Sequence, residues 1–161
     1  MATGAATEAE GFRAREEAQR ERRRAEYDRW AEERDRWRAK NRGYYRAIER
    51  LVKFVVPEGA SVLEIGCGTG DLLAALKPAR GVGLDLSSKQ IEIARHKHPE
   101  LELLVGDAET LELPELEGRT FDYVVLSDVV GALFDVWAAF RALRRMCTAR
   151  TRIVVTYYNF L

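Results

Sequence analysis

The sequence lacks the features of exported and membrane-spanning proteins. No apolar run approaches the roughly 20 residues that a transmembrane helix needs. Residues 1–7 contain neither the basic start nor the apolar segment of a secretory signal. The two cysteines, Cys67 and Cys147, lie far apart and match neither a CxxC motif nor a zinc-binding spacing. Two free thiols suit a reducing compartment, so we expect a cytoplasmic protein without a metal site.

An excess of charge of either sign is also missing. The 26 Lys and Arg residues balance 26 Asp and Glu residues, and the formal net charge is zero. Proteins that bind nucleic acid usually carry a basic excess, so we do not expect nucleic acid as a partner. The length of 161 residues is sufficient for one domain with its own core.

Residues 1–42 are predicted to form a charged helical extension, because Arg and Glu recur at helical spacing without proline. Four large residues recur every seven positions: Trp30, Trp37, Tyr44 and Leu51. This stripe favours a helix that docks one face on the rest of the protein. A self-associating coiled coil, a lid over a ligand, or a basic surface facing phosphate or membrane are the alternatives. Gly43 is expected to break the helix.

Five apolar segments alternate with helical segments in residues 43–161. The expected strands are Val62–Ile65, Gly81–Asp85, Leu101–Val105, Phe121–Asp128 and Thr151–Tyr157. Ser87 and Asp135 have the side chains and positions of helix N-caps. Strands that alternate with helices indicate βαβ units and a parallel sheet. The sequence therefore predicts an α/β domain over residues 43–161.

A glycine-rich turn follows the first predicted strand. Its three glycines stand at alternate positions: Gly66, Gly68 and Gly70. Glycines before a helix allow close approach of a ligand, as in nucleotide-binding folds. The spacing is not Gly-x-Gly-x-x-Gly, and Asp71 at the helix start would repel a pyrophosphate, which disfavours an NAD-dependent oxidoreductase. With Glu64 nearby and Asp85 placed to accept ribose hydroxyls, the turn suits a nucleoside that carries positive charge.

Four segments resemble the class I S-adenosylmethionine-dependent methyltransferases in order and spacing. They are Val62–Gly70, Gly83–Ser87, Gly106–Glu109 and Phe121–Val125. The resemblance covers about residues 44–158. It implies a Rossmann-like, doubly wound parallel sheet of strand order 3-2-1-4-5, with helices on both faces and S-adenosyl-L-methionine as cofactor. The activity it implies is methyl transfer by in-line displacement.

The resemblance also implies a cofactor site around the glycine turn. Its residues would be Glu64, Gly66, Cys67, Gly68, Gly70, Asp85, Leu86, Asp107, Ala108 and Ser127. The glycines would pass under the methionine part and the ribose, and Glu64 would hold the loop or the cofactor's amino group. Asp85 would bind the ribose hydroxyls, with Leu86 against the adenine. Asp107 would accept a hydrogen bond from the adenine amino group, and the Ala108 amide would face the ring.

Purely structural roles stay open for the three acids. Glu64 could cap the turn, Asp85 could cap the next helix, and Asp107 could be an ordinary turn residue. Ser127 and Asp128, after the fourth strand, would border the methyl group and the acceptor pocket. No residue stands in the motif of a general base, so the sequence names no catalytic residue.

The sequence departs from the family after its fifth strand, where two further strands normally follow. We expect a truncated or split enzyme, or the cofactor-binding part of a longer protein, with an oligomer or partner domain covering the strand edge. Residues 157–159, together with the region of Trp37, Asn41, Tyr44 and Tyr45, resemble a bacterial group associated with glycans or envelope lipids. The expected acceptor is a small molecule, lipid or glycan. The alternative is a non-catalytic module that binds S-adenosylmethionine or a partner.

Overall fold

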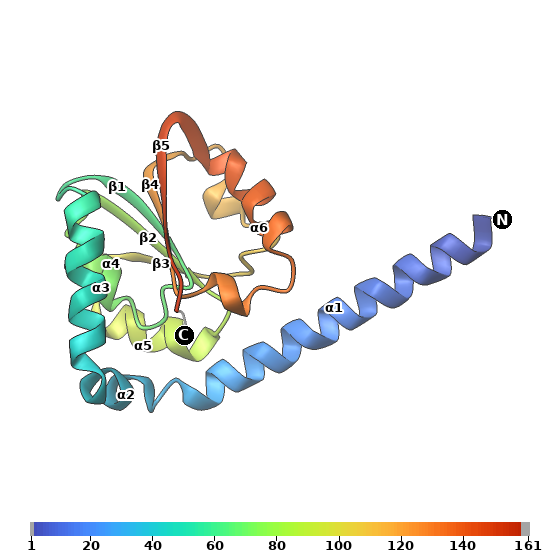
Figure 1. The fold of residues 1–161 in the computed structure, drawn as a ribbon, viewed down its shortest axis with the longest axis horizontal. Helices are drawn as coiled ribbons and strands as arrows, with labels where there is room; N and C mark the ends of the chain where they lie inside the picture. The colour runs from blue at the N-terminus through green and yellow to red at the C-terminus, as the bar shows by residue number, and fades with distance from the viewer. Residues whose placement is uncertain (1, 159–161) are drawn as a thin grey trace.

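A computed structural model describes residues 2–158 as a parallel sheet flanked by helices (Figure 1). Residue 1 and residues 159–161, and with them the end of the 157–159 motif, lie outside the described part. The strands are β1 (Ser61–Ile65), β2 (Arg80–Asp85), β3 (Glu102–Val105), β4 (Phe121–Ser127) and β5 (Cys147–Thr156). The α-helices are α1 (Ala2–Trp30), α2 (Arg34–Lys40), α3 (Arg42–Val55), α4 (Asp71–Ala75), α5 (Ser88–Lys97) and α6 (Val136–Leu143). Short 3-10 helices are η1 (Pro114–Leu116), η2 (Val130–Ala132) and η3 (Arg144–Met146).

The strand order is β3-β2-β1-β4-β5 and every pair is parallel, which confirms the predicted fold class. Ile65 of β1 lies beside Leu84 of β2 on one side and Leu126 of β4 on the other. The chain therefore winds outward in both directions from β1. In such sheets, ligands bind beyond the carboxyl ends of the strands where the order reverses.

Strand β5 begins earlier than predicted, at Cys147 instead of Thr151. Cys147 pairs with Phe121, and a register shift separates this pair from the next, between Tyr123 and Arg152. The first residues of β5 are polar and largely exposed, so their hydrophobic pattern does not indicate a strand. Pairing with β4 decides their conformation.

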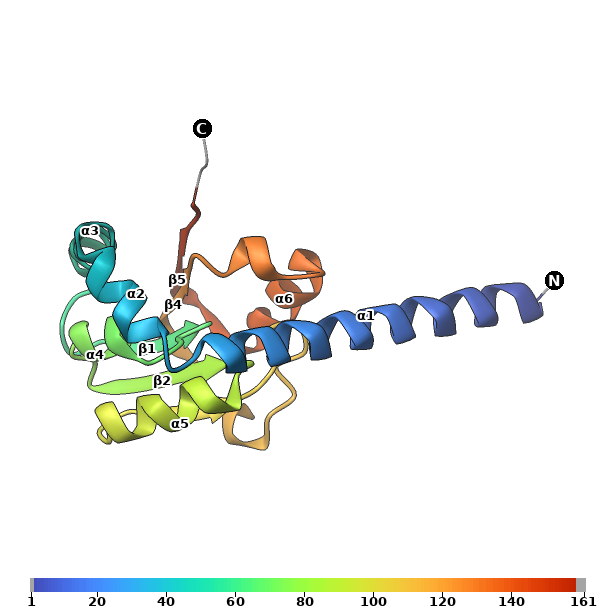
Figure 2. The same ribbon diagram turned by 90° about the horizontal axis from the view of Figure 1, so that it is seen from below.

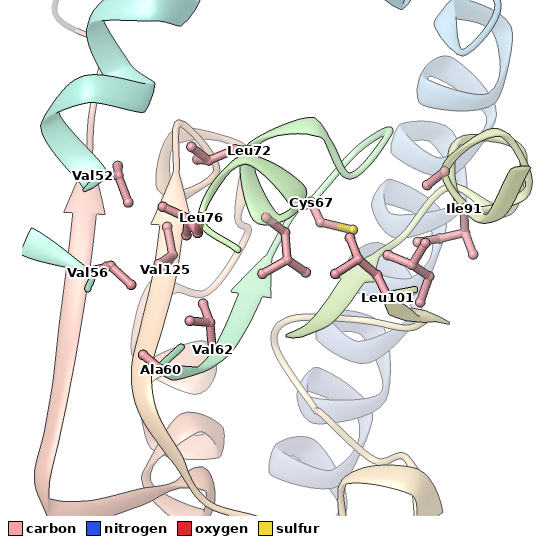
Figure 3. Packing of buried hydrophobic residues seen from close by; sticks show 13 residues of the cluster. Val52, Val56, Ala60, Val62, Cys67, Leu72, Leu76, Ile91, Leu101 and Val125 are labelled. Atoms are coloured by element: carbon pink, nitrogen blue, oxygen red, sulfur yellow. The ribbon is translucent and has the colours of Figure 1, made fainter. Parts of the chain in front are cut away.

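Each face of the sheet carries its own hydrophobic core. Val62 packs with α3, α4 and α5 in the first core, where Val52 and Ile91 are fully buried (Figure 3). The next residue, Leu63, belongs to the second core, with Leu116 and with Leu143 of α6. Successive side chains of a strand point to opposite faces, so β1 supplies both cores. Helices on both faces are thereby confirmed.

The predicted docking stripe of the N-terminal segment is wrong. Trp30, Trp37 and Leu51 are 59%, 60% and 54% exposed. The segment is not one helix, because a turn at residues 31–33 separates α1 from α2 and Asn41 separates α2 from α3. These turns rotate each helix relative to the last, so a seven-residue spacing does not follow one face.

Other residues of the segment are buried in place of that stripe. Ala31, in the turn between α1 and α2, is 2% exposed, and Val52 and Val56 join the first core. Gly43 lies within α3 and does not interrupt it, so the predicted break is two residues later than the observed one at Asn41. Helix formation from Arg42 continues through Gly43 because α3 is held by the packing of its later turns.

Helix α1 starts far from the sheet and reaches the domain beside α5 (Figures 1 and 2). Asp28 Oδ1 accepts hydrogen bonds from Ser87 Oγ (2.5 Å) and from the Lys89 amide (3.3 Å) at the start of α5. We refer to residues 20–40, from the last turns of α1 to the end of α2, as the arm. The arm is therefore attached to the domain at the carboxyl side of β2.

Both predicted helix caps are confirmed. Ser87 Oγ accepts from the Gln90 amide at 3.1 Å, and Asp135 Oδ1 accepts from the Ala138 amide at 2.9 Å. We expect Asp135→Ala to lower the free energy of unfolding by about 1 kcal/mol, because a first-turn N–H loses its acceptor. Asp135→Asn retains an acceptor and should match the parent protein in urea denaturation. An Asp135→Asn variant as unstable as Asp135→Ala would contradict the capping role.

Candidate functional site

A cavity of about 230 Å³ lies at the carboxyl ends of β1, β2, β3 and β4. Residues after these strands form its floor, and the arm and α3 form its other walls. Eight of the residues predicted to bind cofactor line it: Glu64, Gly66, Cys67, Asp85, Leu86, Asp107, Ala108 and Ser127. The fold thus brings segments that are far apart in the sequence to one cavity.

Two predicted residues, Gly68 and Gly70, are not among its lining residues. Gly70 has a φ of 78°, and a Cβ on it would lie 3.2 Å from His98 Cδ2 and 3.6 Å from Ala94 Cβ. It therefore faces α5, and its role in the structure is to close the turn. A Cβ on Gly68, at a φ of 56°, would lie 2.7 Å from Arg34 Nε of the arm. Arg34 thus covers the middle of the turn.

Glu64 is an acid buried in the floor of the cavity, with 2% of its surface exposed. Burial raises its pKa to about 8, although the charges of Arg38 and Arg34 and the Leu73 amide act in the opposite direction. Its Oε2 has no hydrogen-bond partner among residues 2–158. A buried acceptor that faces a cavity without a partner fits a cationic or hydrogen-donating group of a ligand.

Asp85 holds the glycine turn in shape. Its Oδ2 accepts from the Gly68 amide at 2.8 Å, and its Oδ1 accepts from the Ser87 amide at 2.9 Å. Burial raises the pKa of Asp85, while these two bonds and the Arg34 charge lower it, and the net shift is upward. Each carboxylate oxygen can accept a second hydrogen bond, so the structural role is compatible with binding ribose hydroxyls.

Arginines of the arm pair with acids at the far end of the cavity. Arg20 Nε forms an ion pair with Asp107 Oδ2. Arg23 Nη2 lies 3.3 Å from Glu109 Oε1, which also accepts from the Phe134 amide at 2.7 Å. These contacts place the arm over the site. The apolar stripe of the sequence does not reveal them, because charged side chains on a helix are usually solvated and their spacing does not show which of them find partners.

The negative charge of Asp71, at the start of α4, is balanced by cationic side chains of the protein itself. Burial by itself would raise its pKa, but hydrogen bonds lower it: they come from Lys97 Nζ (2.8 Å), Thr69 Oγ1 (2.8 Å) and His98 Nε2 (3.1 Å). Arg38 Nε lies 3.2 Å from Asp71 Oδ2. Asp71 does not line the cavity, and its ion pairs tie α2 to α4 and α5.

Comparison with known families matches most of the sheet to one protein family. A family model described as a methyltransferase domain matches residues 63–153, which include the end of β1, the glycine turn, β4 and α6. The match covers more than half of the 161 residues. The chain belongs to this methyltransferase family.

Curated relatives of this chain act on quinones according to their names. A demethylmenaquinone methyltransferase of Bacillus licheniformis is 40% identical over 79 residues, which are 44% of this chain and 33% of the relative. A 2-phytyl-1,4-naphtoquinone methyltransferase of Thermosynechococcus vestitus is 32% identical over 112 residues, 65% of this chain and 48% of the relative. The chain thus spans between a third and a half of these proteins.

A solved structure shares the fold of this methyltransferase. It is an S-adenosylmethionine-dependent methyltransferase from Thermotoga maritima, described as a possible histamine N-methyltransferase. It is 29% identical, with a TM-score of 0.69 over 80% of this chain and 58% of that protein. S-adenosylmethionine is therefore the cofactor that the family implies.

A polar cluster borders the cavity after β4. Asp128 has a φ of 57°, and its Oδ1 accepts from Thr156 Oγ1 at 3.0 Å while its Oδ2 accepts from the Tyr44 hydroxyl. Burial and the bond to Asp128 raise the pKa of Tyr44. Ser127 Oγ lies 3.2 Å from Thr156 Oγ1. A non-glycine residue adopts a left-handed conformation only at an energetic cost. The contacts around Asp128 therefore hold it in this conformation.

Membrane-spanning and metal-binding features are both missing from the described part of the chain. In the stretch from residue 2 to residue 158, no helix is both long and apolar enough to cross a membrane. Within the same range, no three His, Cys, Asp or Glu side chains gather where they could hold a metal ion. Both cysteines are free. Burial raises the pKa of Cys67, so its thiol stays protonated in the floor of the cavity.

Proposed function

We propose that this domain binds S-adenosylmethionine in the cavity and transfers its methyl group to a small organic acceptor. The observation that carries the proposal is the unpartnered Oε2 of Glu64 beside Gly66, at the point where the strand order reverses. The cofactor's amino-acid end carries an ammonium group, which fits this acceptor. The family match supports the same ligand.

Three acids on successive strand ends would hold the cofactor. Glu64 would accept from the ammonium group, Asp85 from the ribose hydroxyls, and Asp107 from the adenine amino group. All three line the cavity. Arg20 holds the Asp107 carboxylate in this structure, so binding of adenine requires Arg20 to share or release that carboxylate. Cys67, Leu86 and the Ala108 amide would supply the less polar walls.

When bound, the cofactor supplies a methyl group on a positively charged sulfur, which is the leaving group of an in-line displacement. The chain's own residues have to align the acceptor and exclude water. Ser127 and Asp128 border the end of the cavity at which the acceptor would lie.

We propose an aromatic, quinone-like molecule as the acceptor class. A cluster of tyrosine rings lies near Asp128, and one of them, Tyr45, lines the cavity. Tyr44 lies 5.4 Å from Tyr45 and 5.6 Å from Tyr158, in both cases edge to face. Such a cluster suits a flat apolar ring. The names of the curated relatives support the same class.

Calorimetry with S-adenosylhomocysteine tests the cofactor site. Asp85→Ala should weaken binding at least about tenfold, because a carboxylate that accepts from the ligand is lost together with the shape of the turn. The matched control is Asp122→Ala. Asp122 also accepts from a backbone amide, that of Ser61 at 2.9 Å, but at the opposite end of the sheet. Equal affinities in the two variants would refute the proposed site.

Transfer of labelled methyl groups to a panel of reduced quinones, catechols and amines tests the acceptor. Methylation of reduced quinones is the expected result. Binding of S-adenosylhomocysteine without transfer to any acceptor would point to a non-catalytic module. Absence of binding would refute the whole proposal.

A further inference from the structure

Four arginines of the arm line the cavity, and three of them already have partners. Arg20 pairs with Asp107, and Arg23 pairs with Glu109 and donates to the Ala132 carbonyl. Arg38 pairs with Asp71 and stacks on the Tyr45 ring at 4.2 Å. The fourth, Arg34, differs from them: no ion pair joins it to an acid in the described part of the chain, and its buried Nε has no hydrogen-bond partner there.

The guanidinium of Arg34 lies against the glycine turn. A Cβ on Gly68 would be 2.7 Å from Nε, 2.8 Å from Nη2 and 2.9 Å from Cζ of Arg34. Its positive charge also acts on the two buried acids of the turn, since it lowers the pKa values of Glu64 and Asp85 against the effect of burial. Arg34 is therefore a cation over the turn whose buried Nε lacks an acceptor among residues 2–158.

One acidic and one basic side chain, each with an unsatisfied polar atom, thus face the same cavity. Glu64 Oε2 lacks a donor, and Arg34 Nε lacks an acceptor, within the described part of the chain. Buried polar groups without partners are rare in native proteins and call for a ligand or ordered water. A zwitterion with an ammonium and a carboxylate would satisfy both. The planar fork of a guanidinium matches a carboxylate better than any other side chain does.

We propose that Arg34 binds the α-carboxylate of S-adenosylmethionine, which makes the arm a part of the cofactor site. This inference rests on the proposed function, because it assumes that the cofactor's amino-acid end lies over the glycine turn. Glu64 then faces the ammonium group and Arg34 the carboxylate of the same α-carbon. The core domain alone would hold the nucleoside and leave the carboxylate without a cation.

A pair of ligands that differ in one group tests the proposal: S-adenosylmethionine and its decarboxylated form. Calorimetric titration of Arg34→Ala should show about 10- to 100-fold weaker binding of S-adenosylmethionine, the range expected for a lost charge-assisted hydrogen bond. Binding of the decarboxylated ligand should change less than about twofold. Arg34→Lys keeps the charge but loses the fork, so its affinity should be intermediate.

The matched control is Arg36→Ala, two positions away on the same helix, with a side chain that is 82% exposed. It should leave both affinities unchanged. Arg34→Met retains the aliphatic stem and serves if Arg34→Ala does not fold, which thermal unfolding would show. Equal weakening of both ligands would make Arg34 a structural residue, and tighter binding of both would mean that it blocks the site. Either result overturns the inference. If the parent protein binds neither ligand, the proposed function itself fails.

Discussion

Gly66→Ala is expected to lower the free energy of unfolding by about 2–5 kcal/mol. Gly66 has a φ of 70°, a left-handed conformation that costs a residue with a Cβ about 1–2 kcal/mol. The new Cβ would also lie 2.6 Å from Val129 Cγ2 and 2.9 Å from Val129 Cβ. Overpacking of this kind adds about 1–3 kcal/mol. Urea denaturation measures the difference, and calorimetry should show weaker binding of S-adenosylhomocysteine.

Two further variants separate the backbone cost from the packing cost. Gly118 has a φ of 69°, and a Cβ added there would meet nothing within 4 Å, so Gly118→Ala should show the backbone cost alone. In the Gly66→Ala background, Val129→Ala should recover part of the packing cost, measured as a double-mutant coupling. If Gly66→Ala is no less stable than Gly118→Ala, then Val129 moves aside freely and the steric argument is wrong.

Glu64→Gln is expected to remove a loss of stability that the parent protein undergoes as the pH rises. The pKa of Glu64 is about 8 in the folded protein, against an ordinary value of 4.5 for a solvated glutamate. Between these values the folded state binds more protons than the unfolded state, so stability falls as the pH rises through the interval. A difference of one in pKa corresponds to about 1.4 kcal/mol. Because the site relaxes partly when Glu64 ionises, we expect the free energy of unfolding to fall by about 2–4 kcal/mol over the whole interval. Glutamine stays neutral throughout.

Urea denaturation of the parent protein and Glu64→Gln at pH 5, 6.5 and 8 measures this difference. The advantage of Glu64→Gln should be smallest at pH 5 and largest at pH 8. Glu58→Gln is the control, because the Glu58 side chain is 66% exposed and should follow the parent protein at every pH. A constant difference between Glu64→Gln and the parent protein would mean that Glu64 ionises normally in the folded state.

Most of the domain was predictable because its signals are local. Val62 and Leu63 are both apolar and point to opposite faces of β1. Ser87 and Asp135 start helices through hydrogen bonds to residues three positions away. Gly66 is required by a turn that closes within a few residues. The resemblance to a known family then supplied the strand order, which no local pattern contains. The boundary between the N-terminal extension and the domain, at residues 42 and 43, stays a prediction. The individual cofactor contacts stay predictions as well.

The arm shows what local patterns do not contain. The spacing of Trp30 and Trp37 is periodic, yet both side chains are exposed, because the turn at residues 31–33 redirects the chain. The contacts that place the arm join residues far apart in the sequence, such as Arg20 with Asp107 and Asp28 with Ser87. Charged residues on a helix are usually solvated, so a sequence does not reveal which of them find partners.

The sequence by itself determined the class of fold, the glycine turn and the acids at the ends of its strands, since hydrophobic period and turn chemistry depend on neighbouring residues. Only the tertiary structure decided that an arginine of the N-terminal segment covers Gly68, that Tyr44 pairs with Asp128, and that Glu64 Oε2 is left without a partner among residues 2–158. These features depend on how distant segments meet. Their geometry follows from the packing of the helices on the sheet, which the hydrophobic pattern of one segment does not specify.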